Sequence, residues 1–198
     1  MIPDSSFLPA REAVFTAIDF ETTGSVPGWP NEPWQIGMCE VSPSGRGRRL
    51  SAWLHVSRER PFNRYAPGRH AQLRDELDAA PPLPAIWDAV SPWLRGRPLV
   101  AHNIGTERSI LRAAAPLERL GPWVDTLRLA RRQLPTLPSY ALEDVIAALG
   151  LSETVRAMCP GLAPHDALFD AVACGVLLRH FLDQPGWERV TVADIAVS

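Results

Sequence analysis

Cysteine is scarce in this 198-residue chain. Its three cysteines, Cys39, Cys159 and Cys174, are an odd number, and no two of them have the Cys-x-x-Cys spacing. This pattern argues against a disulfide framework and against a zinc site, and it is typical of a protein kept in a reducing cytosol. We therefore expect a cytoplasmic protein.

Long apolar runs are also missing. The sequence has no stretch of about 18 apolar residues, which a membrane-spanning helix needs. Residues 1–10 lack the basic segment followed by a long apolar run that marks a secretory signal peptide. These two absences predict a protein without a membrane partner.

A strong excess of one charge is the third absence. The formal net charge is −2, from 20 basic and 22 acidic residues. A basic domain is the usual footprint of broad electrostatic capture of nucleic acid, so the composition gives no support to that mode of binding. The hydrophobic fraction of 46% and the charged fraction of 21% are ordinary for a globular protein, and 198 residues are enough for one domain with its own core.

Hydrophobic periodicity predicts an α/β protein. The expected strands are 13–20, 34–41, 48–56, 98–101 and 123–125, and the expected helices are 71–79, 83–95, 102–120, 126–133, 139–149 and 166–183. Three strands with tight turns, followed by alternating helices and strands, predict a mixed sheet with helices on its faces. We expect residues 1–12 to form an arm, and residues 184–198 to add a last strand or to pack as a flap.

Two acidic residues stand at the end of the first expected strand. Asp19 and Glu21 are two positions apart, so both side chains point to the same face. Two carboxylates on one face repel each other unless a cation lies between them, and Mg²⁺ and Mn²⁺ prefer such oxygen ligands. The alternative is a solvated strand end with two surface acids, which the apolar run before Asp19 makes less favourable.

A second polar group lies where a short strand gives way to a helix. His102 and Asn103 stand in the turn, and Glu107 falls in the first helical turn. As alternatives to a role in a site, Glu107 can complement the helix dipole, and His102 and Asn103 can bond the local backbone.

A third polar group lies at the start of the last long helix. His165 precedes this helix, and Asp170 falls beside its buried stripe, close to the sheet, where an acid needs a partner or a metal. The alternative is a helix N-terminal region with two exposed acids, of which Asp166 is the better N-cap.

Together these stretches resemble the three exonuclease motifs of the DEDDh branch of the DnaQ-like superfamily. The first motif is matched by Asp19, Glu21, Thr22, Thr23 and Gly24, and the third by His165, Ala167, Asp170 and Ala171. The flanking segments fit as well: Gln35-Ile36-Gly37, Asp125-Thr126-Leu127 and Ser139-Tyr140-Ala141-Leu142. The resemblance covers about residues 13–183. We therefore expect an N-terminal arm over 1–12, an exonuclease domain over 13–183, and a C-terminal tail over 184–198 that packs on the domain.

The resemblance implies an α/β, ribonuclease-H-like fold with a mixed five-stranded sheet flanked by helices. It implies a 3′→5′ exonuclease that uses two divalent cations, Mg²⁺ or Mn²⁺, and releases nucleoside 5′-monophosphates from DNA or RNA ends. The implied metal ligands are Asp19, Glu21, Asp170 and Glu107, with Asp19 bridging both ions, and the implied general base is His165. The implied substrate contacts are Phe20, Thr22, Thr23, Gly24, His102 and Asn103.

The second motif departs from the family at two positions. The family usually has an aspartate where this chain has Glu107 and a phenylalanine where it has Thr106. Glutamate keeps the charge but moves the carboxylate one methylene further from the backbone. The alternative function is therefore a catalytically weakened nucleic-acid-binding or polymerase accessory domain of the same fold.

The expected partner is a single-stranded or 3′-terminal nucleic acid. The sequence carries no polymerase domain, so a proofreading role would require a polymerase or another replication or repair protein. The choice between DNA and RNA and the oligomeric state stay open at this point.

Other polar and aromatic residues have expected structural roles. We expect Asp125 to be a hydrogen-bonding acid away from the three motifs. We expect the following tryptophans to pack in the core: Trp53, Trp87, Trp93 and Trp123. Trp29 and Trp34 flank the loop of the first motif, and we expect them to pack as well, with base stacking as the alternative. We expect two small basic clusters to be solvated, with phosphate contact as the alternative: Arg46, Arg48 and Arg49, and Arg128, Arg131 and Arg132.

Overall fold

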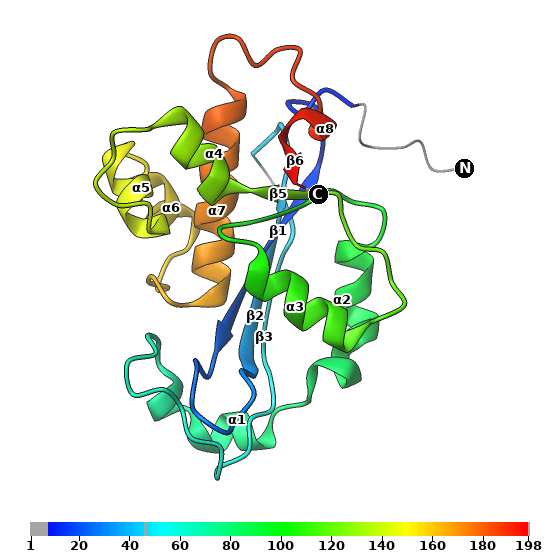
Figure 1. The fold of residues 1–198 in the computed structure, drawn as a ribbon, viewed down its shortest axis with the longest axis vertical. Coiled ribbons are helices and arrows are strands. Elements are labelled where there is room, and N and C mark those ends of the chain that lie inside the picture. The colour runs from blue at the N-terminus through cyan, green and yellow to red at the C-terminus, as the bar shows by residue number, and fades with distance from the viewer. Residues whose placement is uncertain (1–7, 46, 198) are drawn as a thin grey trace.

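The computed structural model describes residues 8–45 and 47–197, so residues 1–7 of the expected arm lie outside the described residues. The centre is a mixed sheet with the strand order β3-β2-β1-β4-β5-β6 (Figure 1). The strands are β1 Phe15–Thr22, β2 Pro33–Val41, β3 Arg49–Trp53, β4 Leu99–Ala101, β5 Trp123–Asp125 and β6 Ala196–Val197.

The strand directions follow the expected pattern. β1, β2 and β3 form an antiparallel meander, and β4 and β5 run parallel to β1. The expected mixed α/β sheet is confirmed. A sixth strand is added to the five expected ones because residues of the tail pair with β5 in antiparallel register.

Helices cover both faces of this sheet (Figure 1). The short 3₁₀ helices are η2 His70–Gln72 and η3 Leu83–Ile86, and the α-helices are α1 Arg74–Ala79, α2 Trp87–Leu94, α3 Gly105–Ala114, α4 Thr126–Gln133, α5 Leu142–Ala148, α6 Ser152–Met158, α7 Ala167–Leu182 and α8 Val192–Ile195. Among the described residues, no helix has both the length and the hydropathy needed to cross a membrane.

Two helices differ from the expectation. α3 ends at Ala114 instead of near residue 120, because Ala115 precedes Pro116 and the residue before a proline is disfavoured in the α conformation. α6 is absent from the elements expected from sequence, although its Val155 is fully buried between the helical neighbours α5 and α7.

The core has two main clusters, one on each face of the sheet. Phe15 and Ala17 of β1 pack in the cluster that contains the buried side of α7, and Ile18 and Phe20 pack in the cluster beneath α2 and α3. Because side chains alternate along a strand, Asp19 continues the face that packs against α7. The fold therefore directs the first acidic pair towards α7.

The tryptophans behave largely as expected. Trp93 and Trp123 are buried, and Trp53 and Trp87 are partly buried against core clusters. Trp34 is 1% exposed, and Trp29 is exposed on the loop after β1. Packing is thus confirmed for the first four.

Candidate active site

The C-terminal end of β1 carries two of the predicted ligands. Asp19 is partly buried and Glu21 is buried. Burial, followed by the charges of Glu107 and Asp170, raises the pKa of Asp19 well above its ordinary value. Burial, followed by the charge of Asp170, raises the pKa of Glu21 to about 8. Both shifts follow from like charges held close together away from water, a situation that a bound cation would relieve.

Strand β2 holds the start of α7 against these two carboxylates. The Gln35 side chain donates to Asp166 Oδ2 (3.1 Å) and accepts from the main-chain N–H of Ala167 (3.2 Å). A Cβ on Gly37 would lie 2.1 Å from the main-chain carbonyl carbon of Ala167, so glycine alone leaves room for the helix. In the ladder, Gln35 and Gly37 lie opposite the two acids of β1. The flanking Gln-Ile-Gly segment therefore joins the third motif to the first.

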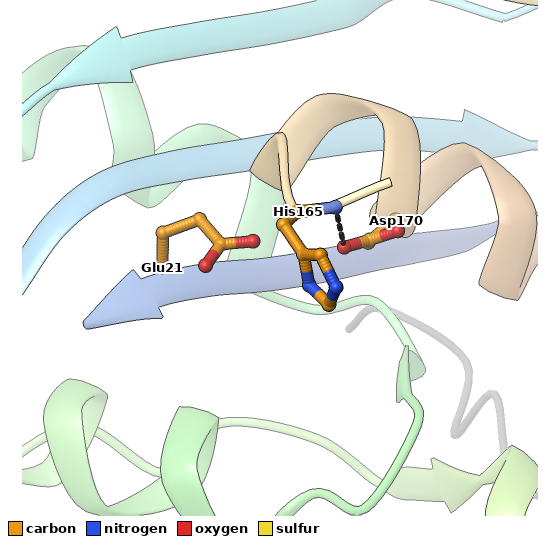
Figure 2. A group of neighbouring side chains, drawn as sticks. All are labelled: Glu21, His165 and Asp170. Atoms are coloured by element: carbon orange, nitrogen blue, oxygen red, sulfur yellow. Dashed lines mark hydrogen bonds between the residues drawn. The ribbon is translucent and has the colours of Figure 1, made fainter. Parts of the chain in front are cut away.

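The third motif meets Glu21 at the N-terminus of α7. Figure 2 shows His165 and Asp170 beside Glu21, with the His165 main-chain N–H donating to Asp170 Oδ2 (3.0 Å). One ligand atom from each of these three residues lies within 4.8 Å of the other two. Burial raises the pKa of Asp170 to about 6, although the hydrogen bond from His165 lowers it. Asp166 caps α7 by accepting from Leu168 N, so the expected N-cap is confirmed.

Glu107 faces Asp19 from α3. It is 4% exposed, and burial raises its pKa to about 7, while hydrogen bonds from its own main-chain N–H and that of Phe20 lower it. Its charge is the second cause, after burial, of the raised pKa of Asp19. Within the described part of the chain, Glu107 Oε2 is buried without a hydrogen-bond partner. A role at the helix N-terminus alone leaves that oxygen unsatisfied, whereas a cation would satisfy it.

A small cavity of about 150 Å³ opens beside these acids. Asp19, His102 and Asp170 line it, together with the start of α5. The His102 Nε2–H donates to the Tyr140 carbonyl (2.8 Å), and its Nδ1 lies 2.9 Å from Thr126 Oγ1. Both ring nitrogens therefore have internal partners, and His102 is fixed in the wall of the cavity.

Strained backbone occurs at two predicted site residues. In the described ranges, the non-glycine residues with positive φ are Asn103 (69°) and His165 (65°). Such conformations are uncommon outside glycine and concentrate at functional sites. Asn103 N donates to Asp125 Oδ1 (3.0 Å), and Asp125 also caps α4. The structural role expected for Asp125 is confirmed, but its expected place away from the motifs is wrong.

The loop after β1 depends on an arginine that no sequence motif singled out. Arg60 is 1% exposed and donates from Nη2 to Thr23 Oγ1 (2.9 Å) and from Nε to Glu32 Oε1 (3.1 Å). Its guanidinium also lies over the ring of Trp29, 5.3 Å from the centroid. Arg60 thereby fixes the conformation of the segment that follows Glu21.

The remaining predicted substrate contacts of the first motif have largely structural side chains. Phe20 packs in the core, and Thr23 is fully buried against Arg60. The Thr22 carbonyl accepts from Trp34 Nε1 (3.2 Å), and Gly24 has a φ of 72° that favours glycine. The side chains of Phe20 and Thr23 are therefore not available to a substrate, which would meet only the main chain there.

The donor set fits hard divalent cations. Asp19 and Glu21 from β1, Glu107 from α3 and Asp170 from α7 bring four carboxylates to one end of the sheet. Carboxylate oxygens suit Mg²⁺ and Mn²⁺. The orphaned oxygen of Glu107 is the observation that favours an ion over simple packing.

Comparisons with known proteins agree with this arrangement. The RNase_T family model, described as exonuclease, matches residues 16–178. Exonuclease X, solved in complex with 5′-overhanging duplex DNA, has a TM-score of 0.66 and 27% identity, over 91% of this chain and 98% of that chain. The nuclease domain of 3′hExo, a DEDDh family member bound to rAMP, has a TM-score of 0.68 and 16% identity, over 89% and 94%.

A more distant structural likeness is to E. coli exonuclease I in complex with a dT13 oligonucleotide. Its TM-score is 0.62 at 14% identity, over 87% of this chain and 41% of that chain. No curated protein sequence matches the chain. The family match runs from β1 into α7 and so includes all three motifs. The chain therefore belongs to the RNase_T exonuclease family, and its fold is the DnaQ-like, ribonuclease-H-like one.

Proposed function

We propose that this protein is a metal-dependent 3′→5′ exonuclease that releases nucleoside 5′-monophosphates from the end of a nucleic acid strand. The observation that carries the proposal is the convergence of four carboxylates and His165 at one end of the sheet, with a buried Glu107 oxygen that has no partner in the described residues. An acidic site of this kind matches the hydrolytic chemistry of the family.

Asp19, Glu21, Glu107 and Asp170 would hold two divalent cations, Mg²⁺ or Mn²⁺. Such cations lower the pKa of a bound water and offset the charge that develops on the leaving oxygen. His165 is exposed at the mouth of the small cavity, beside Asp170. It would take the proton from the attacking water, a general-base role that suits imidazole.

The proposed substrate is a single-stranded or 3′-terminal nucleic acid. Support comes from two similar solved structures. Exonuclease X was solved with 5′-overhanging duplex DNA, and a second structure shows the recognition of a histone mRNA stem-loop by a 3′-exonuclease. The two neighbours were thus solved with DNA and with RNA, so both are candidate substrates here. The neighbours named above do not support a polymerase partner for this chain, and its cytoplasmic location stays a prediction.

A binding domain without catalysis is less well supported. That alternative was motivated by the longer side chain of Glu107, but the Glu107 carboxylate still faces Asp19 and is still buried. The second motif thus keeps a carboxyl group at the site.

Digestion of 5′-labelled DNA and RNA oligonucleotides with Mn²⁺ or Mg²⁺ tests the proposal. A 3′→5′ exonuclease produces a ladder of shortened labelled strands, whereas the opposite polarity releases a labelled mononucleotide at once. Asp19→Ala should abolish cleavage and keep the circular dichroism spectrum of the wild type. Undiminished turnover in Asp19→Ala would contradict the site assignment, and an absent ladder in the wild type would contradict the activity.

A further inference from the structure

A large cleft lies on the far side of the second motif from the small cavity. Its volume is about 1100 Å³, and it lies between α3, the segment 115–122, α4 and β6. A typical small-molecule pocket measures about 300–1,000 Å³ and is mostly apolar. This cleft slightly exceeds that size, and arginines dominate its polar lining. It therefore suits an extended, negatively charged ligand better than a small apolar one.

Arginines from three separate segments gather in the cleft. The lining includes Arg108 and Arg112 of α3, Arg119 of the following segment, and Arg128 and Arg131 of α4, and all five are exposed. The chain as a whole has a net charge of −2, so this positive surface is local. All 20 basic residues of the sequence are arginines, whose planar guanidinium groups match phosphate oxygens two at a time.

Within the described residues, the two acids of the lining form no ion pair with Arg112, Arg119 or Arg131. Glu118 accepts from Arg95 Nε (2.9 Å) and Trp87 Nε1 (3.2 Å), neither of which lines the cleft. Asp125 is buried and accepts from three main-chain N–H groups, and the Arg128 side chain approaches it only to 3.9 Å. Glu118 and the Oδ1 of Asp125 thus have other partners, the Oδ2 of Asp125 forms a long ion pair with Arg128, and the lining holds five arginines against two acids.

The cleft adjoins the candidate active site at the second motif, where His102 lines the small cavity and the next residue, Asn103, lines the cleft. The guanidinium of Arg131 lies over the ring of Tyr140, 5.8 Å from the centroid, and the Tyr140 carbonyl accepts from His102 Nε2 in the wall of the small cavity. A strand whose terminal nucleotide lies at the carboxylates would then continue past Asn103 into the cleft.

We propose that this arginine cleft binds the phosphate backbone of the substrate strand upstream of its 3′ end. The inference rests on the proposed function, because it takes the carboxylate site as the place where the strand ends. It adds to that function the place where the upstream nucleotides bind, and the mode of binding, by charge and without base specificity.

Binding of a fluorescent single-stranded oligonucleotide in EDTA, measured by anisotropy, tests the cleft without catalysis. Removal of two arginine–phosphate contacts should make the slope of log K against log salt shallower by about 1.4, since each contact contributes about 0.7 for a single strand. If affinities converge near 1 M salt, Arg112→Ala/Arg128→Ala should bind about 25-fold more weakly than wild type at 0.1 M.

A matched control removes the same charge elsewhere. Arg132→Ala/Arg189→Ala changes two exposed arginines that do not line the cleft, so its affinity and salt slope should follow the wild type. An unchanged slope in the cleft variant, or an equal loss in the control, would overturn the inference.

A substrate without upstream nucleotides separates the cleft from the catalytic site. The p-nitrophenyl ester of thymidine 5′-monophosphate is a phosphodiester that cannot reach the cleft. Its turnover should be equal in the wild type and in the cleft variant, while kcat/KM for the oligonucleotide falls. Equal loss on both substrates would overturn the inference, because the arginines would then act on the active site itself. A wild type that binds the oligonucleotide through the cleft but cleaves neither substrate would instead refute the proposed function alone.

Discussion

Replacement of Glu21 with glutamine tests the electrostatics of the site. Burial and neighbouring carboxylates raise the pKa of Glu21 from 4.5 to about 8 in the metal-free protein. Below pH 4.5, the folded and unfolded chains both carry the proton, so the shift has no effect on stability. Between 4.5 and about 8, the unfolded chain loses the proton that the folded chain keeps, so the free energy of unfolding falls as pH rises. Above about pH 8, the free energy of unfolding has fallen by the full amount that the shift gives.

The size of this effect follows from the shift. One pKa unit corresponds to about 1.4 kcal/mol, so a shift from 4.5 to about 8 corresponds to a loss on the order of 4–5 kcal/mol. A typical domain has a total stability of roughly 5–15 kcal/mol, so the loss is large enough to measure. Glu21→Gln keeps the shape and removes the titration. The free energy of unfolding of the variant, minus that of the wild type, should therefore increase between pH 4.5 and 8.

Urea unfolding in EDTA across pH 4.5 to 8.5 measures this difference. Glu153→Gln, a change at an exposed position of α6, is the matched control and should follow the wild type. Added Mn²⁺ should stabilise the wild type increasingly as pH rises, because the ion binds the ionised carboxylates, and it should stabilise Glu21→Gln less. Parallel curves for the wild type and Glu21→Gln in EDTA would refute the proposed electrostatics.

Substitutions at three further positions have defined outcomes. His165→Ala should lower kcat by about 10²–10⁴-fold with little change in metal affinity from calorimetry; collapse of that affinity would make His165 a ligand. Glu107→Asp should raise Mg²⁺-supported kcat/KM, because Mg²⁺ demands stricter ligand geometry than Mn²⁺. Glu107→Ala should lower kcat/KM with either ion. Equal rates in Glu107→Ala and the wild type would leave Glu107 only a role at the helix N-terminus. Gly37→Ala places a Cβ 2.1 Å from the Ala167 carbonyl carbon, so urea unfolding should show that the free energy of unfolding falls by at least about 1–3 kcal/mol. The control Gly105→Ala, with open space at its Cβ, should be neutral or stabilising. Similar results for the two variants would show that α7 shifts freely.

Sequence patterns predicted the elements that carry the carboxylates because those elements have strong periodicity. β1 is nearly continuous in apolar and β-forming residues up to Asp19, and α7 has a long buried side that begins with Ala167. The alternation of a strand placed Asp19 and Glu21 together, and the capping preference of aspartate placed Asp166 at the start of α7. These are local effects, and a single sequence contains them.

Residues that act through distant contacts gave no such signal. Arg60 lies in an irregular segment, and it contacts Thr23, 37 positions earlier in the chain. The arginines of the cleft come from α3, α4 and the segment between them, and only the packing of these elements gathers them on one surface. Runs such as Arg131-Arg132 are also misleading, since Arg131 lines the cleft while Arg132 lies over Trp187. A charge cluster in sequence is therefore not the same as a charge cluster in space.

The weakest of the sequence signals proves to be a central physical link in the site. Gln35-Ile36-Gly37 contributes no carboxylate, and in sequence it is only a flanking match. In the fold, however, Gln35 uses both ends of its amide on the start of α7, and Gly37 permits the contact of helix and strand. That contact holds the start of α7, and with it Asp170, beside Asp19 and Glu21 of β1. The chemistry of the carboxylates thus depends on a strand that bears none of them, because like charges stay together only where the backbone around them is fixed.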